Sequence, residues 1–355
     1  MNSKFFYHDK PLFGLDIGFS TIKVMQSQLL GKDYEVVGYG VGAFDSKAIE
    51  NGVIVDYKSI AGSITKLFKE NIVGEINTRR IVLSVPASKT YTRTIELPAI
   101  KDEEIPDAVR IEAEQYIPIP LDELYLDHSI IKRSDKGVEV LAVATPKKIV
   151  DSHIKLAHIL GLEPVGFDTS ILAVARLFEK QDDDNNIPAV LVDFGSVSTD
   201  ITIHDGTVTV TGTIPGGGDI FTESISKTLG VTNEEAHIIK TKYGMGKSKK
   251  QNQILTALQP TVDQLAKEIQ RMIRYHEERS DSEKKIGQVI TMGGGANMPG
   301  LSDYLTNIIR LPVRTCEPLS NFKLGRLRPP NNLEKSIYVT VAGLSLIDPK
   351  ELFQS

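Results

Sequence analysis

The sequence predicts an α/β protein of two related domains, and this prediction rests on a repeated hairpin pattern and on the chain length. An apolar strand reaches Asp16, turns at Gly18 and continues as a second β-prone segment. The same pattern returns around Asp193 and Gly195. A chain of 355 residues exceeds the usual size of a single hydrophobic core. We therefore expect one hairpin in each domain, and two such hairpins facing each other would bind one polyphosphate.

Composition excludes several classes of protein. Hydrophobic residues make up 41% of the chain and charged residues 25%, as in ordinary globular proteins. No apolar run is long enough to span a bilayer, and no secretory signal is visible. The net charge of −5 gives no overall attraction to nucleic acid or anionic lipid. The single cysteine, Cys316, excludes an internal disulfide, suits a reducing cytosol and is expected to be structural.

The residue types of the first hairpin suit phosphate binding. Glycine lets a phosphate approach bare backbone N–H groups, and Ser20 and Thr21 add hydroxyl donors. Asp16, at the end of its strand, is placed to face a metal ion or its bound water. A single Asp-x-Gly turn is more often ordinary turn chemistry. The repeat at Asp193, and the later glycines at 216–218 and 293–295, favour a phosphate site.

The first half of the chain alternates strands with helices. Residues 12–41 predict three strands, followed by a short strand after Gly52, a helix over 57–71 and a buried strand over 80–86. From residue 87 to 161 the pattern changes and predicts a small α+β module inserted into the first domain. Its expected elements are a strand over 91–97, a helix over 102–116, strands over 123–131 and 137–144, and a helix over 145–160.

The most unusual stretch of this module lies where its first helix ends. Two prolines hold apolar side chains in an extended conformation there. An extended apolar rim of this kind could receive a peptide, while a rigid loop that covers its own core is the alternative. The candidate partner-binding residues are Tyr116, Ile117, Pro118, Ile119, Pro120 and Leu121.

A strand over 163–167 and a helix over 168–179 lead to an acidic segment, 181–188, that predicts a solvated linker. Its consecutive carboxylates point in different directions, so we expect no metal site there. The second half repeats the strand, glycine and helix pattern. Its expected elements are the Asp193 hairpin, a strand over 207–214, helices over 220–229, 232–243 and 260–279, a strand over 286–292, and helices over 302–310 and 337–346; the basic run 247–250 is expected to be a solvated loop.

The order of these motifs resembles that of the actin-like ATPase superfamily, which has a ribonuclease-H-like fold. Within it, the inserted module resembles the one shared by the division protein FtsA and the PilM family of type IV pilus assembly. Val85, residues 112–121, Asp168 and residues 265–271 resemble the PilM family in particular. FtsA usually ends in an amphipathic membrane helix; the chain lacks this, which favours PilM. The resemblance implies a first domain core over 1–86, an SHS2-like module over 87–161, a return and linker over 162–186, a second domain over 187–330 and a returning C-terminal helix over 331–355.

The resemblance implies binding of ATP and Mg²⁺. Asp16 and Asp193 would hold Mg²⁺, through water. Phe19 departs from the family, where a small residue is common, so its ring is expected to narrow the site. No residue is identified as catalytic, so we expect an ATP-binding protein with at most slow hydrolysis. The implied nucleotide-binding residues are Asp16, Gly18, Phe19, Ser20, Thr21, Lys23, Asp193, Gly195, Ser196, Thr199, Gly217, Gly218, Asp219, Glu268, Arg271, Gly294, Gly295 and Ala296.

The resemblance further implies a cytoplasmic scaffold that docks the N-terminal cytoplasmic segment of PilN and is peripheral to the inner membrane through this partner. Other platform proteins and the motor ATPases of pilus assembly are implied partners, nucleic acid is not, and homo-oligomer formation stays open. Two alternatives remain. One is an FtsA-like, filament-forming membrane tether of cell division. The other is a small-molecule kinase of the same superfamily, in which an Asp of the second domain acts as general base.

Overall fold

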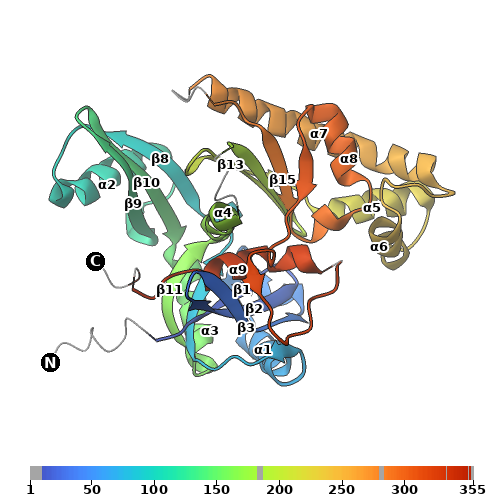
Figure 1. Ribbon diagram of the computed structural model, residues 1–355, viewed down its shortest axis with the longest axis horizontal. Coiled ribbons are helices and arrows are strands. Elements are labelled where there is room, and N and C mark those ends of the chain that lie inside the picture. The colour runs from blue at the N-terminus through green and yellow to red at the C-terminus, as the bar shows by residue number, and fades with distance from the viewer. Residues whose placement is uncertain (1–9, 182–186, 280–283, 333, 351, 353–355) are drawn as a thin grey trace. The chain divides into compact units, whose positions relative to one another are not determined.

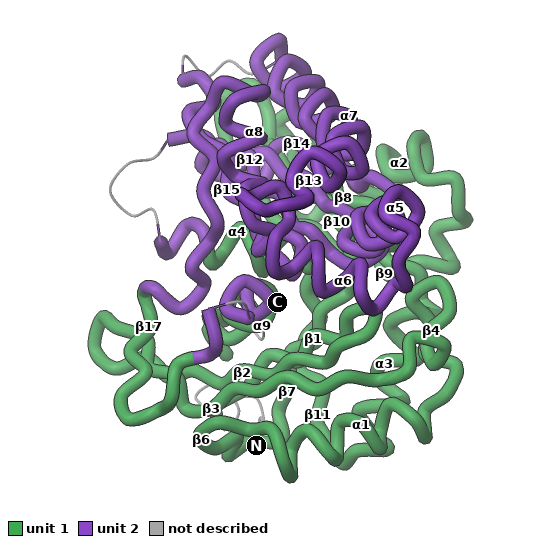
Figure 2. The backbone as a smooth tube through the Cα atoms, turned by 90° about the vertical axis from the view of Figure 1, so that its right-hand side faces the viewer, with its two compact units in different colours: residues 1–177, 321–329, 340–355 green, residues 178–320, 330–339 purple. Residues whose placement is uncertain are grey.

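The computed structural model describes residues 10–181, 187–279, 284–332, 334–350 and 352 (Figure 1). The acidic stretch 182–186 of the expected linker lies outside these residues. The chain forms two compact units, unit 1 with residues 1–177, 321–329 and 340–355 and unit 2 with residues 178–320 and 330–339 (Figure 2). No helix among the described residues is long and apolar enough to cross a membrane.

Unit 1 is built on a mixed sheet in the order β11-β7-β1-β2-β3-β17, with β6 paired to β3. The predicted meander is present, because β1, β2 and β3 are antiparallel neighbours, while β7 and β11 extend the sheet in parallel. The strands are β1 (Phe13–Ile17), β2 (Thr21–Leu30), β3 (Asp33–Ala43), β6 (Ile72–Gly74), β7 (Arg80–Val85), β11 (Glu163–Thr169) and β17 (Phe322–Lys323); β4 (Ile49–Glu50) and β5 (Val53–Ile54) form a separate hairpin.

Side chains of β1 alternate between the two faces of this sheet, as strand geometry requires. Phe13 and Leu15 pack in one cluster with α1 (Tyr57–Glu70) and α3 (Lys147–Ile159). Leu12 packs on the other face with α4 (Ser170–Gln181) and α9 (Val339–Ser345). Asp16 shares this second face, two residues beyond Gly14, which abuts α9. The α4 and α9 face therefore carries the candidate phosphate chemistry.

The inserted module has its own small sheet in the order β8-β10-β9. Helix α2 covers one side of it, where Val109 packs against Val140 and Ile95. The last expected helix of the module, α3, instead places Leu156 and Ala157 in the core of the larger sheet. The elements of the module are β8 (Tyr91–Leu97), α2 (Ile105–Tyr116), β9 (Leu124–Ser134) and β10 (Gly137–Pro146).

Unit 2 repeats the hairpin-plus-parallel-strand arrangement of unit 1. Its sheet has the order β14-β13-β12-β15-β16, and β12 pairs antiparallel with β13 and parallel with β15. One cluster joins the sheet to the helices. The elements are β12 (Ala189–Phe194), β13 (Ser198–His204), β14 (Val208–Pro215), α5 (Gly218–Leu229), α6 (Asn233–Lys242), α7 (Gln251–Glu277), β15 (Gln288–Met292), α8 (Leu301–Ile309) and β16 (Val313–Thr315).

The predicted start of the longest helix is wrong. Helix α7 begins at Gln251 and contains Pro260 in its interior, whereas the sequence suggested a start at Pro260. An interior proline removes one backbone hydrogen bond. Ile254 and Leu258 are buried in the unit 2 core, so the apolar face of α7 extends upstream of the proline. This packing outweighs the local cost of Pro260.

Helices α4 and α9 touch backbone to backbone within unit 1. A Cβ atom on Gly343 of α9 would lie 1.8 Å from the carbonyl oxygen of Ala173 in α4, far inside any permitted contact. Ala173 is fully buried. Only glycine at position 343 therefore allows this close packing.

We predict that Gly343→Ala destabilises the fold. The added methyl group has no space, so the free energy of unfolding should fall by about 1–3 kcal/mol, measured by urea denaturation. Gly62 is the matched control, because a Cβ atom there meets nothing within 4 Å and the residue lies within α1. Gly62→Ala should leave stability unchanged or raise it by up to about 1 kcal/mol. Equal effects of the two substitutions would contradict the close-packing account.

Candidate functional site

The first hairpin forms a tight turn directly after Asp16. Asp16 lies at the end of β1 and is 8% exposed. The turn closes through the Gly18 N–H, which donates to the Thr21 carbonyl oxygen at 2.9 Å. Phe19 lies at the tip with 44% exposure, and Ser20 is the next residue of the turn. The structure thus brings together the six predicted residues of unit 1, which are Asp16, Gly18, Phe19, Ser20, Thr21 and Lys23.

The carboxylate of Asp16 is held from two sides. Lys23, directly opposite on β2, donates from Nζ to Asp16 Oδ2 at 2.8 Å. Ser84 on β7 donates from Oγ to Asp16 Oδ1 at 2.5 Å. Asp168 on β11 is in register with Ser84. Four neighbouring strands therefore carry a polar row, and we refer to Lys23, Asp16, Ser84 and Asp168 as the polar row.

The second hairpin places two carboxylates side by side. Asp193 on β12 pairs directly with Asp200 on β13, so both side chains lie on one face of the sheet. Burial raises the pKa of Asp200, and a hydrogen bond from Thr213 opposes this; the Thr213 hydroxyl lies 2.6 Å from Asp200 Oδ1. In unit 1 the position opposite the hairpin aspartate is Lys23, so the second hairpin is the acidic one. It is suited to attract a cation.

The glycine turn before α5 packs directly on this hairpin. A Cβ atom on Gly217 would lie 2.2 Å from the Gly195 carbonyl oxygen, and the Gly218 N–H donates to the same oxygen at 2.9 Å. The Thr199 hydroxyl donates to the Gly216 carbonyl oxygen at 2.9 Å. The structure therefore joins six predicted residues, which are Gly195, Ser196, Thr199, Gly217, Gly218 and Asp219.

The late glycine segment reaches the same hairpin from β15. Gly293 has φ of 78°, and a Cβ atom there would lie 2.3 Å from Asp193 Oδ1. Gly295 approaches Phe194 in the same way, since its Cβ atom would lie 2.7 Å from that of Phe194. The predicted Gly294 and Ala296 belong to the short 3-10 helix that follows. Glycine is required here because the backbone lies directly against the hairpin.

Lys240 is a site residue that sequence reasoning missed. Its Nζ donates at 2.8 Å to both the Gly218 carbonyl oxygen and the Thr222 hydroxyl. The side chain is only 7% exposed, and burial lowers its pKa while Asp219 opposes the shift. Lys240 lies four residues after the buried Ala236 on α6, so helical spacing placed it on the buried face.

Glu268 and Arg271 do not join the glycine segments. On α7 they form an ion pair with each other at 2.6 Å, and the Arg271 side chain is 72% exposed. Within the described residues, no hydrogen bond or ion pair connects them to the second hairpin. Their proposed place beside the base therefore has no contact to support it.

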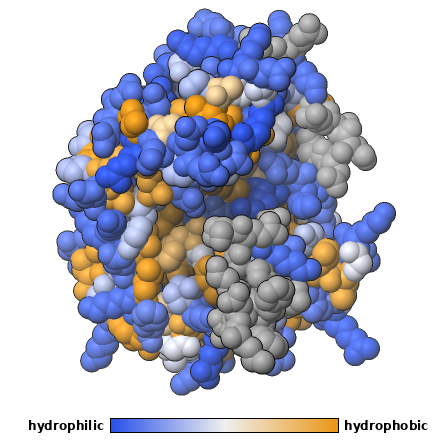
Figure 3. Space-filling view, turned by 90° about the vertical axis from the view of Figure 1, so that its left-hand side faces the viewer, coloured by the Kyte–Doolittle hydropathy of each residue, from blue (hydrophilic) through white to orange (hydrophobic). Residues whose placement is uncertain are grey.

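The proline rim of the inserted module covers part of the module's own core and also lines a pocket. Ile117 and Leu121 are buried with Ala113 in the module's own core. The rim also lines a pocket of about 420 Å³. Arg110 and Asp122, which line it too, form an ion pair of 3.1 Å. The side of the molecule toward this module shows hydrophobic patches broken up by hydrophilic residues (Figure 3). The pocket residues are Arg110, Glu114, Ile117, Pro118, Ile119, Pro120, Leu121 and Asp122.

The Tyr116 ring completes the rim from α2. The Arg93 guanidinium lies 4.7 Å from the ring centroid. Burial raises the pKa of the Tyr116 phenol, with Arg93 opposing the shift. The rim thus combines apolar side chains with charged groups of both signs around one pocket.

Comparison with known proteins agrees with this geometry. The family model of the type IV pilus assembly protein PilM matches residues 14–348. A solved PilM-PilN type IV pilus biogenesis complex superposes with a TM-score of 0.82 at 22% identity, covering 94% of this chain and 97% of that one. MreB5 of Spiroplasma citri, solved bound to ADP, matches with a TM-score of 0.52 at 13% identity over 98% of this chain and all of that one.

A curated relative adds sequence evidence. The cell division protein FtsA of Bacillus subtilis (strain 168) is 24% identical over 346 residues, which cover 86% of this chain and 78% of that protein. The actin-like ATPase fold predicted from the two hairpins is confirmed. Because its family model spans nearly the whole chain, this protein belongs to the PilM family of type IV pilus assembly proteins.

Proposed function

We propose that this protein is an ATP-binding scaffold of type IV pilus assembly that docks the N-terminal cytoplasmic segment of PilN. The observation that carries the nucleotide part is the duplicated hairpin with an aspartate at each strand end. The likeness to a PilM-PilN complex supports the choice of partner. The likeness to an ADP-bound MreB5 supports a nucleotide as the ligand of this fold.

In this proposal each hairpin has a distinct electrostatic role. The first contributes backbone N–H groups and the Lys23 ammonium, which balance phosphate charge. The second contributes the Asp193 and Asp200 carboxylates, which are the oxygen ligands that Mg²⁺ prefers. Since Lys23 and Ser84 already occupy both Asp16 oxygens, Asp16 would hold Mg²⁺ through water. Gly217 and Gly218 would lie beside the ribose, and Gly294 and Gly295 beside the adenosine.

ATP acts in this proposal mainly as a ligand that selects a conformation. No side chain is assigned the role of activating water, so hydrolysis is slow at most. The relationship to FtsA favours one second candidate, a filament-forming tether. Sedimentation with ATP and liposomes distinguishes it, because robust lipid-bound filaments without any partner would favour the tether over the scaffold.

The PilN segment is proposed to bind at the rim, Tyr116 to Leu121. Pro118 and Pro120 present their side chains to solvent while Ile119 is half-buried, so the pocket offers a rigid apolar wall. A rigid wall lowers the entropy cost of binding a short peptide. This contact would hold the protein at the inner membrane through its partner.

Removing either hairpin carboxylate should strongly weaken binding of Mg-ATP. Asp16→Ala and Asp193→Ala each delete a charged acceptor, so we expect affinity to fall by roughly tenfold to a hundredfold or more in calorimetry. Asp33→Ala is the control, since Asp33 forms an exposed ion pair with Lys323. Circular dichroism should show intact folds, and unchanged affinity in both hairpin variants would refute the two-hairpin site.

The raised pKa of Asp200 predicts a pH dependence. A carboxyl group whose pKa lies above the ordinary value takes up a proton at higher pH, so Mg-ATP affinity should begin to fall earlier on acidification. Asp200→Asn should bind more weakly at neutral pH and lose this part of the dependence. The titration of ATP itself is common to both proteins. Parallel affinity curves for the wild type and the variant would contradict the assignment.

A charge in the rim should block the PilN segment. Ile119→Glu places a carboxylate in the pocket wall, so affinity for the N-terminal PilN peptide should fall more than about tenfold in fluorescence polarisation. Ile111→Glu is the matched control, because Ile111 lies on α2 of the same module but is 62% exposed and does not line the pocket. If both variants bind the peptide equally well, the rim is not the docking site.

A further inference from the structure

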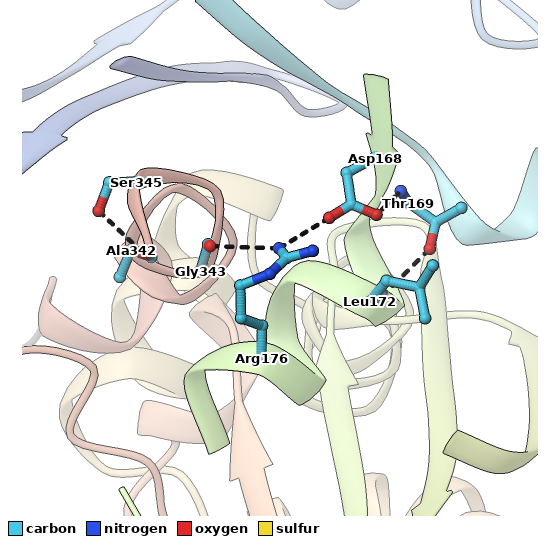
Figure 4. Close-up of polar contacts among 7 residues, drawn as sticks. All are labelled: Asp168, Thr169, Leu172, Arg176, Ala342, Gly343 and Ser345. Atoms are coloured by element: carbon cyan, nitrogen blue, oxygen red, sulfur yellow. Dashed lines mark hydrogen bonds and ion pairs between the residues drawn. The ribbon is translucent and has the colours of Figure 1, made fainter. Parts of the chain in front are cut away.

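The Arg176 guanidinium joins three parts of unit 1. Its Nη1 lies 2.8 Å from Asp168 Oδ2 and donates to the Gly343 carbonyl oxygen at 3.3 Å. Asp168 also accepts from its neighbour, with the Thr169 N–H 2.8 Å from Oδ1. Figure 4 shows Arg176 of α4 between the end of β11 and helix α9. We call Asp168, Arg176 and the Gly343 carbonyl the arginine bridge.

The bridge lies where the chain passes from one compact unit to the other. Arg176 is followed directly by the change of unit between residues 177 and 178, and Gly343 follows the change between 339 and 340 by a few residues. The close contact of Gly343 with Ala173 means that α9 cannot move toward α4. One guanidinium therefore ties together two of the segments that connect the units.

Charge and burial make this pairing hard to replace. Burial raises the pKa of Asp168, and the charge and hydrogen bond of Arg176 oppose that shift. A buried carboxylate without its partner would be costly. At the other end, Gly343 belongs to the last turn of α9, where the helix dipole favours a cation. Both contacts thus favour a permanent positive charge at position 176.

The bridge is also continuous with the candidate phosphate site. Asp168 is in register with Ser84, which donates to Asp16. A cation or phosphate that approaches the polar row changes the field at Asp168, and Arg176 is the group that balances this field. The strength of the contact between Arg176 and the Gly343 carbonyl oxygen therefore depends on the charge at the polar row.

We propose that Arg176 is a positioning residue that fixes α9 to the polar row and passes the state of the bound nucleotide to the two connecting segments. The second half of this statement rests on the proposed function. The first half does not, because the bridge is formed without any ligand. Arg176 needs no contact with the nucleotide for either role.

Hydrogen–deuterium exchange of the full chain tests both halves. Without nucleotide, Arg176→Met should raise amide exchange in 339–345 by roughly tenfold, the loss expected for one charged hydrogen bond. Asp168→Asn/Arg176→Met removes the uncompensated charge as well and should show the same loosening with a more stable fold than the single variant. Arg110→Met is the control, since it breaks an exposed ion pair in the module, and it should leave 339–345 unchanged.

The second arm adds Mg-ATP. Wild-type protein should gain protection in 339–345, and Arg176→Met should lose most of this gain while its calorimetric affinity stays within about threefold, as expected for a residue outside the contact shell. Exchange within twofold of wild type in both bridge variants without nucleotide would overturn the positioning role. An ATP effect that persists in Arg176→Met would overturn the coupling. Failure of the wild type to bind ATP refutes the proposed function and leaves the first arm standing.

Discussion

The polar row of unit 1 is centred on a buried carboxylate at the end of β1. Asp16 is 8% exposed and is balanced by Lys23 on one side and Ser84 on the other. Lys23 lies on the antiparallel neighbour of β1 and Ser84 on its parallel neighbour, so the interaction links three strands of the sheet. The third partner in the row, Asp168, brings in Arg176 and through it α9. One polar row therefore connects the hairpin to the segments that leave the unit.

Unit 2 uses the same backbone plan with a more acidic hairpin. Asp200 replaces the lysine opposite the hairpin aspartate, and glycines from two other segments press against the hairpin where side chains would not fit. Lys240 is the buried cation of this half, yet it serves the turn before α5 rather than the carboxylates. The two copies of the hairpin thus differ in charge, because one pairs its aspartate with a lysine and the other with a second aspartate.

Local patterns predicted the fold well, because the aspartate, the glycine turn and the following β-prone segment of each hairpin lie within a few residues of one another in the sequence. Contacts set by sheet register were harder. Nothing near Ser84 in the sequence shows that its strand lies beside that of Asp16, and the hairpin pattern around Asp193 does not by itself show that Asp200 lies directly opposite. Pro260 misled the prediction of α7, because core packing outweighed a local rule. Glu268 and Arg271 were expected beside the base, but on α7 they pair with each other. Among the described residues, neither is bonded to the second hairpin. The nucleotide roles of all these residues remain predictions.

We propose that the two hairpins bind a nucleotide together with a divalent cation. The decisive measurement is calorimetric titration of the wild-type chain with ATP, once with Mg²⁺ and once with a chelator. We expect one binding event per chain that weakens by roughly tenfold or more when the cation is removed. An absence of binding, or equal affinity with and without Mg²⁺, would contradict it.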